Sequence, residues 1–183
     1  APLGGDAYIN TIKNLGGDLE NPFQVFPEVA ELYAKRREEL KAIVAERYAA
    51  KAEWAKAHPD LAAKMEFWFS NQAPKINWEA IQQKAGGPTR AASATVLGVL
   101  ATHVENMIVA SADLSNSDKT DGFLKKTHAF KKGDFSGAFF QAGVSELTMA
   151  CCCIGMALHG GVIAACGTFF VFSDYMKPAI RMA

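Results

Sequence analysis

The carboxy-terminal half of the chain alternates short apolar runs of strand length with longer segments of helical or polar character. The apolar runs cover residues 106–110, 139–144 and 162–165. The helical patterns cover residues 89–104, 145–158 and the segment that follows Thr168. Parallel strands need a crossover of a dozen or more residues, usually a helix, so this alternation favours parallel pairing. The sequence therefore predicts an α/β fold in which a parallel sheet is flanked by helices.

A long helix is predicted ahead of the sheet. Between Glu28 and His58, apolar side chains recur at helical spacing and are separated by charges of both signs. Such mixed charges are typical of a solvated helix face rather than of a binding patch. We expect this helical linker to end at His58-Pro59, where Asp60 caps a short second helix.

The segment from Ser111 to Gly133 is polar and is predicted to be one long loop. Loops of this length inside compact domains are usually functional or disordered. Ligands of parallel α/β sheets bind beyond the carboxyl ends of the strands. The predicted strands end at Asp113, at Glu146 and at Cys166–Gly167, so we expect a site there.

Charge and hydropathy exclude several classes of partner. Lys plus Arg and Asp plus Glu both number 19, so no global basic field attracts nucleic acid or an anionic membrane surface. No apolar run reaches the roughly 18–20 uncharged residues of a membrane span. We therefore expect neither nucleic acid nor a membrane as a partner.

Cysteine usage predicts a cytoplasmic protein. Cys151, Cys152 and Cys153 are consecutive, and Cys166 is the fourth cysteine. Successive helical residues point about 100° apart, so the three cannot converge on one metal ion. We interpret all four as thiols of a reducing compartment and predict no metal site in this chain.

Both ends of the chain have the character of a fragment of a longer polypeptide. The chain begins Ala-Pro-Leu-Gly without a methionine, and residues 176–183 form an apolar-periodic run that no glycine or asparagine ends. A helix that stopped there would leave its last carbonyls uncapped. A short native protein with a frayed terminus is the alternative.

Glu146 is the first candidate site residue, because it follows a predicted strand and opens an apolar helix. One interpretation is a first-turn glutamate that the helix dipole stabilises. The other is a carboxyl group shielded from water, which can share a proton with a ligand nitrogen.

Aromatic side chains form a second candidate. Phe169, Phe170, Phe172 and Tyr175 cluster where a predicted strand turns into the last helix. They belong either to the hydrophobic core or to a flat slot for an aromatic ring.

Arg90, near the start of a helix, is the third candidate. Together with the hydroxyl groups of Ser111, Ser115 and Ser117 it can hold a phosphate. A structural role for a lone arginine is the alternative, since the chain has neither a Gly-x-Gly-x-x-Gly motif nor a phosphate-binding loop motif.

Several ordered motifs resemble those of the transketolase family. They are the run GVSE at Gly143–Glu146, GMALHGG at Gly155–Gly161, GTFFVFSDY at Gly167–Tyr175, the loop SADLSNS at Ser111–Ser117, and the opening residues Ala1–Leu3. The resemblance extends from end to end of the chain. It implies a thiamine-diphosphate-dependent enzyme of the pentose phosphate pathway, which transfers two-carbon ketol units between sugar phosphates.

The resemblance also implies which residues bind the cofactor. Glu146 matches the glutamate that hydrogen-bonds N1′ of the aminopyrimidine and supports formation of the thiazolium ylid. Phe169, Phe172 and Tyr175 match the aromatic pocket around that pyrimidine. Asp113 matches the aspartate of the Ser-Ala-Asp-Leu loop, which lies near the cofactor across the subunit interface.

Arg90 and Ser117 match the pair that grips the phosphate of the sugar substrate. The chain departs from the family pattern beside these residues. Ser145 and Leu147 stand where the family usually has Arg and His around the glutamate, and Asp118 replaces a usual Asn. The flanking electrostatics of Glu146 therefore differ from those usual in the family.

The same resemblance divides the chain. Residues 1–57 match the end of the family's diphosphate-binding domain and a linker helix, and residues 58–183 match the first part of its pyrimidine-binding domain. This is a partial thiamine-diphosphate-binding fold. The Gly-Asp-Gly motif that brings in Mg²⁺ and the diphosphate has no match here. We expect the Mg²⁺ ligands outside this chain, a homodimer with a second transketolase subunit in the parent protein, and no activity from this chain alone.

Two other functions remain open at this stage. One is a different thiamine-diphosphate enzyme, either a phosphoketolase or the pyrimidine-binding subunit of a 2-oxo-acid dehydrogenase; the Arg90–Ser117 pair favours sugar phosphates over oxo acids. The other is a non-catalytic α/β interaction module that keeps the fold without the cofactor, and the presence of Glu146 argues against it.

Overall fold

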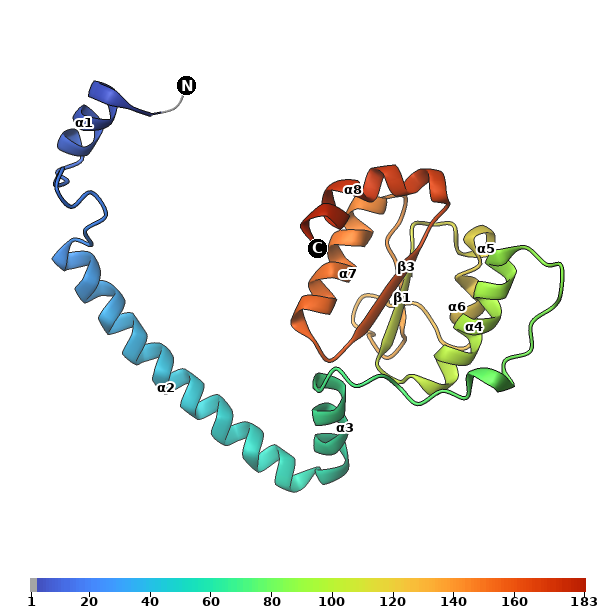
Figure 1. The fold of residues 1–183 in the computed structure, drawn as a ribbon. Helices are drawn as coiled ribbons and strands as arrows, with labels where there is room; N and C mark the ends of the chain where they lie inside the picture. The colour runs from blue at the N-terminus through green and yellow to red at the C-terminus, as the bar shows by residue number, and fades with distance from the viewer. Residues whose placement is uncertain (1–2) are drawn as a thin grey trace. The chain divides into compact units, whose positions relative to one another are not determined.

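The computed structural model describes residues 3–183 (Figure 1). Ala1 and Pro2, where the motif resemblance begins, lie outside the described residues. The chain divides into two units, Ala1–Pro59 and Asp60–Ala183. The second unit carries the sheet and all the candidate site residues.

The sheet has three parallel strands in the order β2-β1-β3, with β1 (Met107–Ser111) between β2 (Phe139–Gln141) and β3 (Ile163–Gly167). Val109 of β1 pairs with Phe139 on one side and with Ala165 on the other. The predicted parallel sheet flanked by helices is therefore confirmed.

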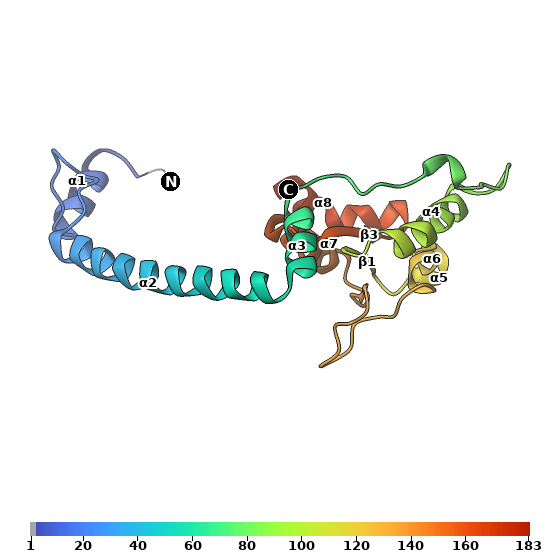
Figure 2. The same ribbon diagram turned by 90° about the horizontal axis from the view of Figure 1, so that it is seen from below.

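Each face of the sheet packs against its own helices, because successive side chains of a strand point to opposite faces. On one face, Met107 and Val109 join a buried cluster with α4 (Thr89–His103) and with Phe123 of α6 (Asp121–Leu124). On the other face, Ala110 packs with Met149 of α7 (Glu146–His159) and Met176 of α8 (Ser173–Met182). The view from below shows the same two layers (Figure 2).

The segment 111–133 is not the single long loop that its polarity predicts. It contains α5 (Ser115–Asp118) and α6 (Asp121–Leu124). Phe123 is 1% exposed and anchors α6 in the core. The polar character of the whole segment does not reveal that one of its side chains is buried.

The second strand is shorter than predicted and ends at Gln141 rather than at residue 144. The amide of Ala142 still donates to the carbonyl of Ser111 at 3.1 Å. Gly143 then adopts a φ of 70°, which turns the chain out of the sheet toward α7.

Two helical segments directly precede α4 in the chain. They are α3 (Pro59–Phe69) and the short 3₁₀ turn η1 (Trp78–Ala80). Asp60 was expected to cap α3, but the helix starts at Pro59, so Asp60 lies in its first turn. Proline suits that first position because its missing N–H would have no partner there.

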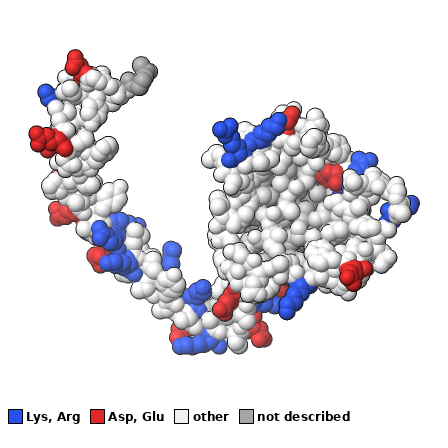
Figure 3. Space-filling view, viewed as in Figure 1, with Lys and Arg blue, Asp and Glu red and all other residues white. Residues whose placement is uncertain are grey.

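The first unit consists of α1 (Gly5–Asn14), which the sequence pattern did not predict, and α2 (Pro27–Ala57), which it did. His58 leaves the helix with φ −134° and ψ 65°, since a residue before proline avoids the helical region. Charges of both signs are interspersed along α2 (Figure 3), and pairs such as Arg36–Glu39 lie within 2.8 Å. This is the solvated face that the charge pattern predicts.

Candidate functional site

A cavity of about 590 Å³ lies beyond the carboxyl ends of the strands. Its lining comes from the turn after β1, the turn before α7, the start of α7 and the aromatic turn into α8: Ala112, Leu114, Val144, Ser145, Glu146, Leu147, Phe172 and Tyr175. Parallel sheets bind ligands at this edge. The volume lies within the usual range for small-molecule sites, roughly 300–1,000 Å³.

Glu146 is the carboxylate of this cavity. It is the first residue of α7 and only 8% exposed, and it shares the buried face of that helix with Met149, Ala150 and Cys153. Within residues 3–183 its carboxylate has neither an ion-pair partner nor a side-chain hydrogen bond, and its oxygens are not among the buried unpaired atoms. The helix N-terminus favours the negative charge. The carboxylate therefore opens into the cavity, where a ligand group can bind it.

Three of the four predicted aromatic side chains gather at this cavity, in the turn that includes η2 (Phe170–Phe172). Phe172 and Tyr175 line it, with ring centroids 6.2 Å apart. Phe169 stacks on Phe172 at 5.9 Å and supports that ring from outside the lining. Phe170 is 94% exposed and does not join them.

Asp113 lies at the rim, between the lining residues Ala112 and Leu114. It is exposed and adopts a φ of 63°, a left-handed conformation that is uncommon outside glycine. The hydroxyl of Ser111 accepts the Leu114 amide at 3.2 Å and closes the turn.

Asp118, which the sequence marked only as a departure from the family pattern, anchors this loop. One carboxylate oxygen accepts the Ser111 hydroxyl at 2.8 Å, and the other accepts both the amide and the hydroxyl of Thr120 at 2.8 Å. A Cβ at Gly167 would lie 2.4 Å from Thr120, so β3 also packs closely on this network. The signal in the sequence is the Asp-x-Thr spacing, which is typical of an Asx turn.

Arg90 and Ser117 are 27 positions apart in sequence and meet in the structure. The guanidinium of Arg90 donates to the carbonyl oxygen of Ser117 at 3.4 Å, and the Ser117 hydroxyl donates to Asn116 at 3.3 Å. Arg90 remains exposed. The contact joins the guanidinium to the backbone of Ser117, and an exposed guanidinium next to this loop can donate to a phosphate group.

Thr168 was not predicted as a site residue. Its hydroxyl is buried without a hydrogen-bond partner in the described part of the chain, immediately after β3 and before Phe169. Buried polar atoms are rarely left unpaired, so this position is unusual among the described residues.

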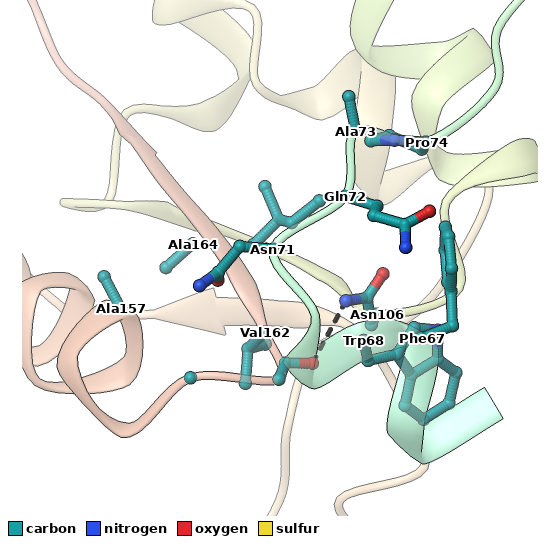
Figure 4. Close-up of a pocket in the computed structure, with 13 residues that line it drawn as sticks. Phe67, Trp68, Asn71, Gln72, Ala73, Pro74, Asn106, Ala157, Val162 and Ala164 are labelled. Carbon is teal, nitrogen blue, oxygen red and sulfur yellow. Dashed lines mark hydrogen bonds between the residues drawn. The ribbon is translucent and has the colours of Figure 1, made fainter. Parts of the chain in front are cut away.

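A second cavity, of about 400 Å³, lies at the opposite, amino-terminal edge of the sheet (Figure 4). It is lined by the aromatic rings of Phe67 and Trp68 and by side-chain amides. Asn106 donates to the carbonyl of Gly161 at 3.0 Å across it. No sequence motif pointed to this cavity.

Residues 3–183 contain no group of three or more His, Cys, Asp or Glu side chains that could hold a metal ion. Within the same residues, no helix combines the length and the apolar character needed to cross a membrane.

Comparison with known proteins connects this geometry to one family. The family model described as "Transketolase, pyrimidine binding domain" matches residues 86–183. The transketolase of Aquifex aeolicus is 40% identical over 185 residues, and that of Bacillus subtilis is 36% identical over 188. Each match covers all of this chain but only 26% and 28% of the relative, so the chain spans about a quarter of their length.

Solved structures agree with the sequence relatives. A Pichia stipitis transketolase solved with sedoheptulose-7-phosphate superposes with a TM-score of 0.81 at 27% identity. The match covers all of this chain and 28% of that one. A transketolase from Leishmania mexicana gives a TM-score of 0.80 at 26% identity. The resemblance first seen in the motifs is thereby confirmed.

Proposed function

The chain belongs to the family of transketolase pyrimidine-binding domains, and from this premise we propose that it forms part of a transketolase, with Glu146 and its aromatic neighbours as the pyrimidine site of thiamine diphosphate. The observation that carries the proposal is that Glu146, which is 8% exposed and whose carboxylate has no side-chain partner among residues 3–183, lines one cavity together with two aromatic rings. That combination suits a flat nitrogen heterocycle that shares a proton with the carboxylate.

The residues present fit the cofactor's pyrimidine end. When bound, thiamine diphosphate supplies the nucleophilic carbon that accepts and releases a two-carbon unit. Glu146, whose carboxylate opens into the cavity, would share a proton with the ring nitrogen N1′. Phe172 and Tyr175 flank the ring, while Phe169 supports Phe172 by stacking on it.

We assign the sugar phosphate to the other side of the loop. Arg90 and Ser117 grip the phosphate group, and Asp113 stands at the cavity rim between the two subsites. The support is the contact between Arg90 and Ser117 in the structure and the sugar phosphate in the related Pichia stipitis enzyme. Ketose and aldose phosphates of the pentose phosphate pathway are then the substrates.

The remaining components of the enzyme are assigned to other chain segments. We place the Mg²⁺ ligands outside residues 1–183, and we propose a homodimer in which a second transketolase subunit completes the cofactor site. Residues 1–57 then end the diphosphate-binding domain and supply the linker helix, and residues 58–183 begin the pyrimidine-binding domain. We expect a cytoplasmic parent protein and no turnover by this chain alone.

A chimera tests the proposal. Residues 1–183 replace the matching segment of the Aquifex aeolicus transketolase, which is 40% identical to this chain. We expect the chimera to transfer ketol units from xylulose-5-phosphate to ribose-5-phosphate when thiamine diphosphate and Mg²⁺ are present. A chimera that folds and dimerises but neither binds the cofactor nor turns over would contradict the proposal.

The chain on its own provides the matched comparison. One carboxylate and a few ring faces give a small contact area to offset the entropy of association, so we expect thiamine diphosphate to bind no tighter than about millimolar. Calorimetry with and without Mg²⁺ should give the same weak affinity. Micromolar, Mg²⁺-dependent binding would show that the chain holds more of the site than we assign to it.

A further inference from the structure

Two cysteines far apart in sequence meet beneath α7. Cys153 lies on the buried face of α7 and Cys166 lies on β3, and both belong to the hydrophobic cluster on that face of the sheet. The Cys153 sulfur is 3.9 Å from the carbonyl oxygen of Ala165, the residue that precedes Cys166. Successive side chains of β3 point to opposite faces of the sheet, so Ala165 joins the cluster on the α4 side while the Cys166 thiol points toward α7, on the same side as Cys153.

This contact makes the two thiols chemically unequal. The neighbouring Cys153 thiol lowers the pKa of Cys166 to about 7, against the opposing effect of burial. The Cys166 thiol, together with burial, raises the pKa of Cys153. Cys166 is therefore the better nucleophile of the pair, because the thiolate is the reactive form. It is only half-buried, on a strand that is the edge of the described sheet.

The other two cysteines point elsewhere. Cys151 is exposed, and Cys152 lines a separate apolar pocket with Phe130 and Phe140. Neighbouring helical positions diverge by about 100°, so a helix presents only one of three consecutive residues to a given strand. Cys151 and Cys152 thus serve as internal controls for a reaction that depends on the fold.

We propose that Cys153 and Cys166 form a redox-reactive dithiol, which a hydroperoxide converts into a disulfide between α7 and β3. The Cys166 thiolate attacks the peroxide oxygen, the O–O bond breaks, and Cys166 becomes a sulfenic acid as hydroxide or an alkoxide leaves. The Cys153 sulfur then attacks the Cys166 sulfur, its thiol proton is lost, and water leaves as the S–S bond forms. Both thiols are oxidised and one peroxide is reduced.

The bond would join two elements that carry the candidate site. Cys153 lies two helical turns after Glu146 on the same face of α7, and Cys166 lies three residues before Phe169. The inference does not depend on the proposed function, because the thiols can be assayed without cofactor or substrate.

Peptide mapping of the folded 183-residue chain tests the proposal. The chain is treated with hydrogen peroxide, remaining thiols are alkylated, and chymotrypsin is used because no Lys or Arg separates the two cysteines. We expect the peptides 148–158 and 159–169 to appear as one cross-linked species that is two hydrogens lighter than their sum, and to separate on reduction. A peptide 159–169 that stays reduced while residues 151–153 are oxidised would overturn the proposal.

Matched variants assign the bond to one cysteine. Cys153→Ala and Cys166→Ser should each abolish the cross-link, whereas the double variant Cys151→Ser/Cys152→Ser should retain it; circular dichroism checks that each variant is folded. A cross-link that persists in Cys153→Ala would overturn the assignment. The wild-type chain in urea gives a test that needs no variant. If oxidation there yields the same cross-link in the same proportion, the fold does not select the pair and the proposal is wrong.

Discussion

Within the described residues, the two ends of the parallel sheet each hold a cavity, and the two cavities differ in the chemistry of their linings. The carboxyl end encloses about 590 Å³ and places the Glu146 carboxylate among aromatic rings. The amino end encloses about 400 Å³ and offers amides, backbone carbonyls and the rings of Phe67 and Trp68. Both volumes suit a small molecule, so volume alone does not identify the functional end.

The direction of α7 explains the difference. This helix begins at the carboxyl end of the sheet with Glu146 and finishes at the amino end with His159 and Gly160. Its positive N-terminal pole therefore stabilises a carboxylate in the first cavity, while its C-terminal carbonyls face the second end. A parallel sheet with crossover helices repeats this asymmetry, which is why such folds bind charged ligands at one edge.

The largest expected effect comes from removing the carboxylate. Glu146→Gln in the chimera should lower turnover by about 10²–10⁴-fold, because proton transfer by a positioned group contributes that much. Steady-state kinetics at saturating thiamine diphosphate measures it. Glu28→Gln is the matched control, since Glu28 is an exposed first-turn glutamate of α2. Near-normal turnover of Glu146→Gln would contradict the assignment of the carboxyl-end cavity as the cofactor site.

The next effect concerns substrate charge at the same end. Arg90→Ala should raise KM for ribose-5-phosphate by about 10- to 150-fold, since a charge-assisted hydrogen bond contributes roughly 1.5–3 kcal/mol. The KM for the unphosphorylated acceptor glycolaldehyde should stay unchanged. Arg37→Ala, on the exposed face of α2, is the control. An equal loss on both acceptors would show that Arg90 only supports the loop.

At the amino end we expect an effect on stability without an effect on chemistry. Gly161 has a φ of 76°, and a Cβ there would lie 2.8 Å from the ring of Phe69. Gly161→Ala should therefore lower the free energy of unfolding by about 1–2 kcal/mol, measured by urea denaturation of the 183-residue chain. Turnover of the chimera should be unchanged. A marked fall in turnover at saturating substrates would show that the amino end of the sheet takes part in the reaction.

Gly155→Ala provides the comparison for that variant. Gly155 lies inside α7, where a Cβ meets nothing within 4 Å. Alanine there should raise stability by about 0.5–1 kcal/mol, because it removes the entropic cost of a helical glycine. If both variants are destabilised, the cost of Gly161→Ala could not be assigned to its positive φ and its contact with Phe69, because any added methyl group in this region would be unfavourable.

The smallest loss is expected at the unpaired hydroxyl of the carboxyl end. Thr168→Val should not lower the free energy of unfolding, because the hydroxyl has no partner to lose among the described residues and valine removes a buried unpaired polar group. Thr120→Val should cost about 1 kcal/mol, because it removes the hydrogen bond to Asp118. Urea denaturation compares the two, and an equal cost would show that Thr168 has a partner in solution.

Local patterns were sufficient to predict most of the fold. The predicted ends of α2, α4 and α7 lie within one or two residues of the observed ends. These ends could be predicted because apolar periodicity and a terminal Pro or Gly are signals carried by neighbouring residues. The features that the sequence did not predict lie where a few buried side chains determine the local structure of a mostly polar segment. The segment 111–133 hides two short helices behind a polar composition, and α6 is held against the core by the buried Phe123 together with Leu124.

The residues of the candidate site also fall into those that the sequence predicted and those that it did not. Glu146 and the aromatic turn could be proposed from the sequence, since a strand end, a helix start and neighbouring aromatic residues are all local signals. Only the local contact of Asp118 with Thr120 has a sequence signal, the Asp-x-Thr spacing, whereas its bond to Ser111 and the close packing of β3 on this network appear only in the structure. The buried hydroxyl of Thr168 gives no signal in the sequence at all.

Spacing along the chain was enough to predict the parallel α/β order, the family resemblance and the residue types of the proposed cofactor site. Which of these residues meet follows from the three-dimensional packing. It brings Arg90 to Ser117 and Cys153 to the same cluster as Cys166, it leaves Phe170 in solvent, and it places the Glu146 carboxylate in a cavity where no other described side chain binds it. The physical reason is that burial and contact depend on the packing of elements distant in sequence, which no local window contains.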